Sequence, residues 1–486
     1  MWPWAVAFIL PNELGERFGF FGTRALLNQY LKAGFGLRDE EAKSYVHLFN
    51  GLVCIFPVVG GAISDSYLGK FNTAVVFYLV ALIGNMLLSV LAIDGVVGEF
   101  GKYPIWAFLI PAVLITMGSG CAKPCAVSLA GDQFKDMKGL DKFYSIHSMM
   151  MNIGILLAVT LIPFIKGSSG YPLAYAAGTG VLLVSLGVLV CGKASFTIVP
   201  PHGEFLPWKI AKLVSHAAAR KLKGHAAEDW LELASDLYDE EMIQEARQFL
   251  RVFVILLPLI FMWVLHEQNI TEWQNQYDIM DKNMLGITIP TESSSLAAAL
   301  MIVFLLPVMG YLVFPGLERR GLRISLGARV AIGYGCFLSA FFISTILQYK
   351  VSASASNRVR VNNVAVSCEG CVSGAWQLPQ WLLFSIGESI MGPNLGLLAY
   401  SNVGPKLKAS AMSLILLTIA VANFFVIGME PVLVHLQSGI DRQWCYVSIS
   451  SVSFVAYLLL LKFWFIPTTA LVSSKELEIG EDDFKN

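Results

Sequence analysis

The feature that most constrains the fold of this chain is a stripe of charge in its first apolar segment. The segment 5–30 is predominantly apolar, and its charged residues are Glu13, Glu16, Arg17 and Arg24. Because an α-helix has about 3.6 residues per turn, the spacings between these residues return them to nearly one face. A charge at membrane depth costs about 2.5–3.5 kcal/mol, so such residues face a protein interior or a water-filled pathway. The stripe therefore predicts a transport protein.

The composition also indicates a membrane protein. Of the 486 residues, 56% are hydrophobic and 14% are charged, whereas a soluble domain has about 25% charged residues. A helix needs about 20 apolar residues to cross a bilayer. The sequence predicts twelve such spans, at about 4–30, 42–65, 71–93, 104–128, 142–165, 171–191, 248–270, 293–314, 325–348, 378–401, 409–433 and 442–466.

One long polar segment, 192–247, divides the chain into six-helix halves at 1–191 and 248–468. The segment contains a basic amphipathic stretch and then an acidic one, which fits either helices along the cytoplasmic membrane face or a plain linker. Two six-helix halves are typical of transporters with a substrate site at the midplane. Residues 469–486 form a short acidic tail that we expect to be cytoplasmic and disordered.

Lys123, Glu267 and Glu388 are further charged residues inside predicted spans. They belong to spans four, seven and ten, so both halves contribute charge to the expected midplane site. Lys and Arg are more numerous in the loops on the side of the termini, which predicts that both termini are cytoplasmic. The sequence leaves open whether the membrane is the plasma membrane or an endolysosomal one.

Several other functions are not expected. The net charge of −1 and the lack of a basic aromatic patch argue against nucleic-acid binding. The sequence has no nucleophile–base motif, phosphate loop or metal-ligand cluster, so we expect no enzyme, metal site or cofactor. Cys368 and Cys371 form a CxxC motif in the loop before span ten. This motif fits half of a zinc site or, in an extracytoplasmic loop, a local disulfide.

Ordered motifs along most of the chain resemble those of the proton-coupled oligopeptide transporter family, a branch of the major facilitator superfamily. The segment Glu13-Leu-Gly-Glu16-Arg17-Phe18 is similar to the family's ExxERF signature. Further matches follow in the family's order at 61–70, 120–134, 143–154, 263–268 and 379–388. The resemblance implies an all-α membrane protein with the major facilitator fold, which has twelve transmembrane helices in two six-helix halves.

The resemblance also implies a substrate site with two charged poles. A dipeptide carries an ammonium and a carboxylate, which are both costly to remove from water without partners. By resemblance, Arg24 and Lys123 meet the carboxylate, while Glu388 and Asn152 meet the amine. The remaining substrate-binding residues expected from the family are Tyr30, Trp263 and Trp381.

Proton coupling requires a carboxylate whose pKa changes as its partner comes and goes. The expected proton-coupling residues are Glu13, Glu16, Arg17, Glu267 and His47. Glu267 is expected to pair with Arg24 across the two halves, so that protonation of Glu267 opens one gate. Asp65 is expected to serve the conformational hinge on the cytoplasmic side.

These residues also have structural interpretations. Glu267, Glu388 and Trp263 can serve helix packing. Arg17 can simply neutralise Glu13, because residues four apart are neighbours on a helix. His47 fits either a proton-handling residue or an ordinary hydrogen-bonded histidine. The sequence also departs from the family at the substrate site. Phe20 and Phe21 replace a common tyrosine pair, and Ala298 stands where an amide is frequent.

We therefore interpret the chain as a proton-coupled symporter of di- and tripeptides that works by alternating access. A proton gradient drives it, no cofactor is needed, and the monomer is expected to function by itself. One alternative is transport of another solute on the same fold, such as histidine, other amino acids, nitrate or organic anions. A second is a transporter-derived sensor that no longer cycles, although so many costly buried charges argue against it.

Overall fold

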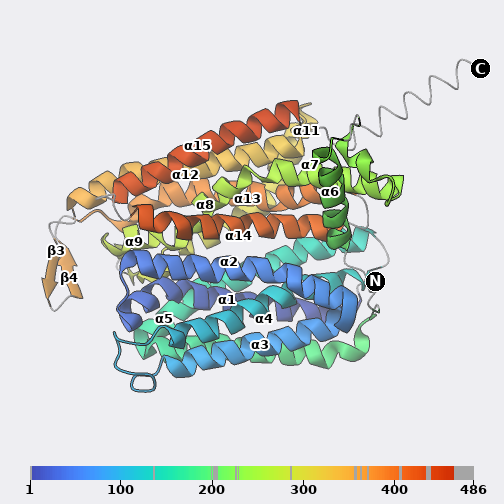
Figure 1. Cartoon of the computed structure of the whole chain (residues 1–486). Helices are drawn as coiled ribbons and strands as arrows, with labels where there is room; N and C mark the ends of the chain where they lie inside the picture. Colours follow the sequence, from blue (N-terminus) through green and yellow to red (C-terminus); the bar gives the residue numbers. More distant parts are fainter. Residues whose placement is uncertain are drawn as a thin grey trace, which may run out of the picture.

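The computed structural model describes residues 3–134, 137–198, 200, 206–224, 227, 229–284, 287–354, 358–361, 364–368, 371–403, 408–433 and 439–464. Long helices form a single elongated bundle (Figure 1). The first half of the chain contributes α1 (Val6–Phe35), α2 (Asp39–Ile63), α3 (Lys70–Leu91), α4 (Trp106–Gly131) and α5 (Met137–Cys191). The helical path of α5 breaks at Gly170, whose φ of 79° is a left-handed conformation that favours glycine. This single element therefore contains predicted spans five and six.

The second half begins with a broken helix. Helix α7 (Glu240–Leu256) is followed by α8 (Leu259–Glu267) and α9 (Glu272–Asp278), and the path bends by 47° after α7. Pro258 lies at the break, where it lacks a backbone N–H for the helical ladder. The remaining helices are α10 (Leu296–Pro307), α11 (Phe314–Arg319), α12 (Leu326–Ser354), α13 (Leu378–Ser401), α14 (Lys408–Leu433) and α15 (Gly439–Phe463).

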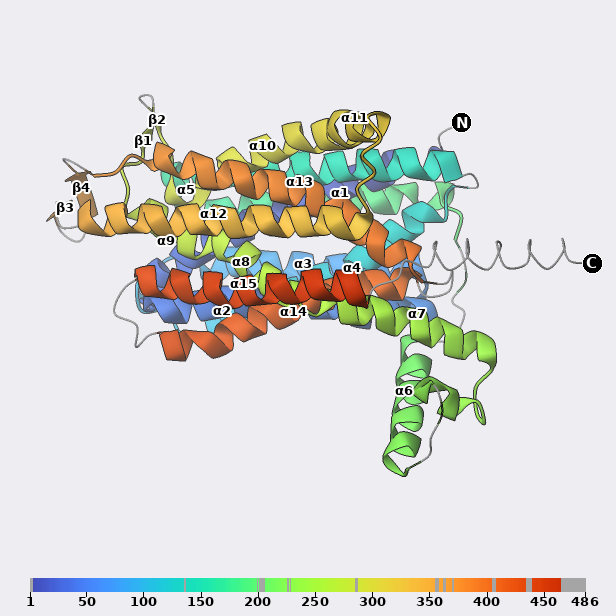
Figure 2. The same ribbon diagram turned by 90° about the horizontal axis from the view of Figure 1, so that it is seen from above.

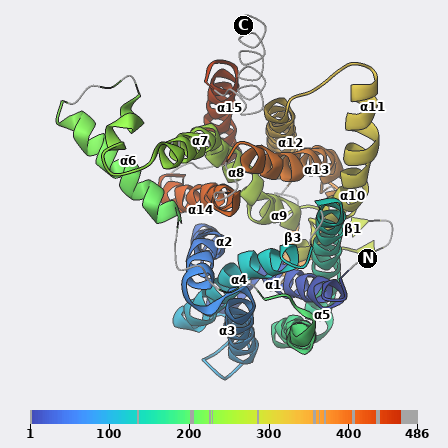
Figure 3. The same cartoon turned by 90° about the vertical axis from the view of Figure 1, so that its right-hand side faces the viewer.

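The helices of the two halves form two groups that lie side by side. Two views show α1–α5 below and α7–α15 above, with α2 next to α14 at the boundary (Figures 1 and 3). A Cβ atom added at Gly51 on α2 would lie 3.2 Å from the ring of Phe424 on α14, so glycine permits this close approach. The arrangement positions α1, α2, α8 and α13 to supply charged side chains to the region between the halves.

Nine helices among the described residues are long and apolar enough to cross a membrane, and the bent path through α7, α8 and α9 adds a tenth. One of the nine, at 149–195, includes the break at Gly170. Helix α1 has a suitable length of 30 residues, but it carries the charged stripe. The expected all-α membrane class is confirmed, whereas the number of twelve crossings and the residue limits of the halves stay predictions.

The polar segment between the halves contains an amphipathic helix. Helix α6 (Leu206–Leu222) lies at the end of the bundle where α1 begins and α15 ends, and it projects to one side of the bundle there (Figure 2). Its residues Ile210, Leu213 and Ala217 are buried in one apolar cluster with Leu231 and Ile243 of the following segment. Leu206–Leu222 is therefore helical, and both interpretations of the segment, helices along a membrane face and a plain linker, stay predictions.

Two short antiparallel hairpins lie at the other end of the bundle. One joins β1 (Asn283–Met284) to β2 (Ile287–Thr288), and the other joins β3 (Arg358–Val361) to β4 (Val364–Cys368).

Cys371 forms a disulfide. This agrees with the disulfide interpretation of the CxxC motif and not with the zinc interpretation. The side chain of Cys368 and the acidic tail 469–486 lie outside the described residues.

Candidate functional site

The centre of the candidate site is a buried ion pair between the two halves. The Nη2 atom of Arg24 on α1 lies 2.6 Å from Oε2 of Glu267 at the end of α8. Only 11% of the Arg24 side chain and 6% of the Glu267 side chain are exposed. Asn50 on α2 also donates a hydrogen bond of 3.0 Å to Oε2 of Glu267. The expected contact is therefore present, and its role as a gate stays a prediction.

Glu267 is also part of a cluster of two acids and a histidine. The Nδ1 atom of His266 lies 3.2 Å from Oε1 of Glu267, and its Nε2 atom lies 3.1 Å from Oε2 of Glu388 on α13. A chain of contacts thus connects Glu388, His266, Glu267 and Arg24. The predicted amine site and the predicted gate are parts of one continuous polar cluster.

A second group of charges lies on the first half. The carboxylate of Glu16 is 1% exposed and lies 3.6 Å from both Nε of Arg17 and Nζ of Lys123 on α4. The Lys123 ammonium also lies 4.1 Å from the centroid of the Phe20 ring, an arrangement that favours a cation. Phe20 thus offers Lys123 a ring face although it lacks the family's hydroxyl. The structure pairs Arg17 with Glu16, whereas the sequence had suggested Glu13.

Glu13 has a different partner, a histidine on α5. Its Oε2 atom lies 3.3 Å from Nε2 of His147 on α5, and both side chains are at most 5% exposed. A carboxylate and an imidazole in contact can share a proton when the ring is charged. The two acids of the ExxER motif therefore lie in separate environments, Glu13 with a histidine and Glu16 with Arg17 and Lys123.

His47 lies at the boundary of the halves. Its Nδ1 atom is 2.8 Å from Oδ1 of Asn423 on α14, and Oγ1 of Thr271 lies 3.5 Å from its Nε2 atom. The ring is fully buried. The contacts are those of a hydrogen-bonded histidine that joins the two halves, and they leave a proton-handling role as a prediction.

The aromatic residues expected in the substrate site are mostly buried in the two cores. Trp263 lies next to the His266 ring at 5.0 Å between centroids. Trp381 packs edge-on against Trp273 at 4.7 Å. Tyr30 is fully buried among rings that include Tyr171 at 4.9 Å. Of the three, Trp263 therefore lies closest to the charged cluster by its contacts, and the substrate roles stay predictions.

Two predicted residues are placed only by their backbone position. Asn152 lies on α5 near Gly154, where a Cβ atom would lie 2.7 Å from the carbonyl oxygen of Leu14 on α1. This close approach brings the Asn152 segment against the charged stripe. Asp65 lies in the π-helical turn Ser64–Leu68 that follows α2, and its side chain lies outside those described.

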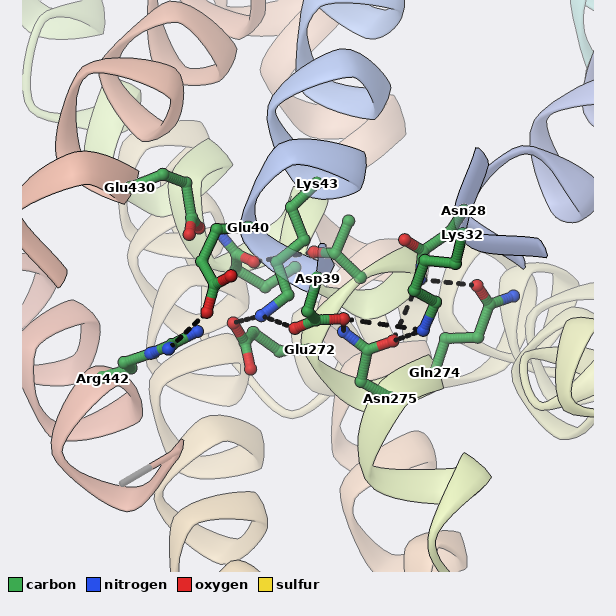
Figure 4. A network of polar contacts seen from close by, with 12 residues as sticks. Asn28, Lys32, Asp39, Glu40, Lys43, Glu272, Gln274, Asn275, Glu430 and Arg442 are labelled. Atoms are coloured by element: carbon green, nitrogen blue, oxygen red, sulfur yellow. Dashed lines mark hydrogen bonds and ion pairs between the residues drawn. The ribbon is translucent and has the colours of Figure 1, made fainter. Parts of the chain in front are cut away.

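An outer network of polar residues, which the sequence analysis missed, joins the halves (Figure 4). It lies near α9, at the end of the bundle away from α6 (Figure 1). The Nζ atom of Lys43 on α2 lies 2.7 Å from Oε1 of Glu272 on α9 and 2.8 Å from Oδ2 of Asp39. Only 2% of the Lys43 side chain is exposed. Arg442 on α15 pairs with Glu40 at 2.8 Å.

Amides extend the outer network towards α1. Asn275 on α9 accepts a hydrogen bond from Lys32 at 2.8 Å and donates one to Asp39 at 2.9 Å. Asn28 donates hydrogen bonds to Gln274 at 3.2 Å and to Asn275 at 3.1 Å. Polar contacts between the described parts of the two halves thus gather at this end, which we infer to be closed.

Some of these partners had a signal in the sequence. Lys43 lies inside a predicted span, and an ionisable residue at that depth is a candidate functional residue. His266 directly precedes Glu267 in the same span. Its contact with Glu388 depends on how α8 and α13 pack, and helical periodicity does not encode that packing.

Comparisons with known proteins agree with this geometry. A family model described as PTR2, the POT family, matches residues 71–443. Solute carrier family 15 member 1 of Mus musculus is 28% identical over 372 residues, which are 72% of this chain and 52% of the relative. Peptide transporter family 1 of Drosophila melanogaster is 29% identical over 373 residues, or 73% and 49% of the two chains. The chain thus spans about half the length of these curated relatives.

Solved structures share the fold. An auto-inhibited POT family peptide transporter superposes with a TM-score of 0.78 at 21% identity, covering 96% of this chain and 98% of that one. A variant of a peptide transporter POT in complex with alafosfalin gives a TM-score of 0.71 at 20% identity, with 94% of each chain covered. The expected major facilitator fold is therefore confirmed.

Proposed function

Because this chain belongs to the POT family, we propose that it carries di- and tripeptides across a membrane together with protons. The two halves rock about the cluster around Arg24 and Glu267, so that the site opens to one side at a time. The proton gradient supplies the driving force without a cofactor, and the monomer is the working unit. The membrane is the plasma membrane or an endolysosomal one, with both termini in the cytoplasm.

The observation that carries the proposal is the ion pair between Arg24 and Glu267. The two residues belong to different halves and are nearly buried, so separating the halves leaves two unpaired charges in a medium that disfavours them. Protonation of Glu267 removes one of these charges. A substrate carboxylate can then replace Glu267 as the partner of Arg24. Each event lowers the cost of opening this gate, which links substrate and proton to the same motion.

The surrounding charges supply the two poles that a peptide needs. Arg24 and Lys123 are the cations for its carboxylate, and Glu388 is the acid for its ammonium. The side chain of Glu388 is 30% exposed, more than that of Glu267, so it is accessible to a ligand. The indole N–H of Trp263 is buried and has no acceptor among the described residues, so it can donate to a peptide carbonyl once the site opens.

The outer network supports alternating access by closing one end. Lys43 and Arg442 each join the halves through an acid, and in the expected orientation this end faces away from the cytoplasm. The same residues must separate when that side opens. The structure is thus assigned to the part of the cycle in which the outer side is closed.

Uptake into liposomes tests the proposed function. The purified protein is reconstituted, and labelled dialanine uptake is measured with an inward proton gradient, with no gradient, and with a protonophore. Accumulation that needs the gradient is the expected result. Unlabelled N-acetyl-dialanine, free histidine and nitrate serve as competitors.

The competitors separate the alternatives. If free histidine or nitrate inhibits uptake and peptides do not, the proposal of peptide transport is replaced by transport of another solute. Binding of peptides without uptake or exchange under any gradient would favour the non-cycling sensor.

A further inference from the structure

The ring of His266 lies between two acids of different helices, and neither the sequence motifs nor the proposed function uses it. Its Nδ1 atom is 3.2 Å from Glu267, and its Nε2 atom is 3.1 Å from Glu388. Glu267 binds Arg24 through its other oxygen, Oε2. His266 is therefore the connection between the acid of the amine site and the acid of the gate.

Hydrogen-bonding capacity shows that this arrangement holds an additional proton. A neutral imidazole has one N–H and one lone pair, and an ionised carboxylate only accepts hydrogen bonds. With a neutral ring and two ionised acids, one ring nitrogen would direct its lone pair at a carboxylate oxygen about 3 Å away. The contacts become favourable when the cluster of two acids and a histidine holds one more proton.

Charge balance leads to the same conclusion. Arg24 contributes one positive charge, and Glu267 and Glu388 contribute two negative charges. One additional proton makes the cluster neutral, and a net buried charge is costly. His47 on α2 interacts electrostatically with Glu267 as well. On the remaining sides, the ring of His266 contacts Phe337 of α12 at 5.6 Å and Phe384 of α13 at 5.1 Å.

We propose that His266 is a proton-binding site that connects amine recognition to the gate. This inference rests on the proposed function, because it takes the ligand of Glu388 to be the ammonium of a peptide. In the empty protein the imidazolium donates a hydrogen bond to Glu267 and lies at ion-pair distance from Glu388. When the ammonium reaches Glu388, it replaces the ring as the partner that neutralises this acid.

The proton then moves within the cluster. The N–H bond at Nδ1 of His266 breaks, its electron pair stays on the nitrogen, and an O–H bond forms at Oε1 of Glu267. The ring is left neutral with its proton on Nε2, and Glu267 no longer attracts Arg24. Arg24 binds the carboxylate of the same peptide. Charge balances throughout, because the zwitterion adds one positive and one negative charge.

The test compares wild type with two variants that represent the two charge states of the ring. His266→Gln is a neutral side chain that does not titrate, and His266→Lys keeps a cation. His216→Gln is the matched control, because His216 lies on α6 and pairs with Asp236, away from the cluster. Dialanine affinity is measured in nanodiscs from about pH 5.5 to about pH 8, the range in which histidine changes charge.

We expect wild type and His216→Gln to lose about tenfold in dialanine affinity as pH rises over this range. Both His266 variants should change by less than about twofold across the range. A purely structural role of His266 predicts a different result. The dialanine affinity of both His266 variants would then fall by the same factor at every pH, and its pH dependence would keep the shape of the wild-type curve. That result would overturn the proposal.

A second measurement needs no variant. Heats of dialanine binding to wild type in buffers of different ionisation enthalpy give the number of protons taken up. This number should rise with pH towards one as the empty site loses its proton, and zero uptake at every pH would refute the inference. If wild type neither binds nor carries dialanine, the proposed function fails instead.

Discussion

Glu267 shows how much one side chain can decide in this protein. It contacts Arg24, Asn50 and His266 at the same time. The resemblance to the family implied the pair with Arg24, and the need of charges in apolar spans for partners agrees with it. It did not predict the contact between His266 and Glu388, because that contact depends on the relative rotation of two helices. Charged residues are therefore easier to predict from sequence than the contacts that connect them.

The pair of Arg24 and Glu267 is testable by a double-mutant cycle. Each alanine substitution leaves the other charge buried without its partner, at a cost of about 3–5 kcal/mol. Arg24→Ala and Glu267→Ala should each nearly abolish dialanine uptake, while thermal unfolding shows whether each variant folds. The double variant should lose less uptake activity, expressed as a free energy, than the sum of the losses of the two single variants. Purely additive effects would exclude an energetic contact.

The role of Glu388 is testable by peptide selectivity. Wild type should bind N-acetyl-dialanine much more weakly than dialanine, because the acetyl group removes the ammonium that Glu388 neutralises. Glu388→Gln should weaken dialanine binding by at least about tenfold, or about 1.4 kcal/mol. The variant should also discriminate less between dialanine and N-acetyl-dialanine. Competition in liposomes measures both. The same substitution at Glu318, an exposed partner of Arg329, is the control. Equal inhibition of wild type by both peptides would discard this assignment.

At the scale of elements, breaks in the helices decide where charges lie. Glu267 ends α8, and Glu272 begins α9 after a short turn, so this broken helix places one acid in the central cluster and the other in the outer network. The hydrophobic pattern predicted the helices well, because burial against lipid requires long apolar segments. It did not place the outer network, since those contacts join the ends of α2, α9 and α15 from distant parts of the chain.

The outer network predicts a specific effect of losing Lys43. Lys43→Ala leaves Glu272 without its ion-pair partner and removes the nearer of the two cations beside Asp39, since Lys32 stays 3.5 Å away. This loss should favour separation of α2 from α9 by about 3–5 kcal/mol. Hydrogen exchange of the α9 amides should become at least about tenfold faster. Lys102→Ala is a suitable control, because its ion pair with Glu99 is exposed and such pairs contribute about 0–1 kcal/mol. Unchanged exchange in Lys43→Ala would show that this end is held closed by other contacts.

At the scale of the whole molecule, the sequence predicted the protein class and the fold, but it left undetermined which end of the bundle is closed. Motif order and span number pointed to two halves around a charged centre. Which end is closed depends on contacts between the halves, such as Arg442 with Glu40. These contacts break and re-form during alternating access, so one sequence must encode both arrangements.

Coupling is a property of the whole cycle, and Glu16 tests it. Glu16→Gln removes the carboxylate that lies near both Arg17 and Lys123. The variant should lose gradient-driven dialanine accumulation but keep counterflow exchange, because exchange needs no net proton movement. Glu41→Gln, which alters an exposed pair with Arg38, should behave as wild type. Accumulation against a gradient by Glu16→Gln would remove this acid from proton coupling.

The balanced pairing of the central charges has an electrical consequence. If the empty cluster is neutral and a peptide enters as a zwitterion, the proton is the only net charge that crosses with it. The membrane voltage then acts on every cycle. An inside-negative potential of about 100 mV contributes about 2.3 kcal/mol per charge moved, which corresponds to about a 50-fold concentration ratio. Current through the reconstituted protein should therefore appear with dialanine, even where the pH is equal on both sides.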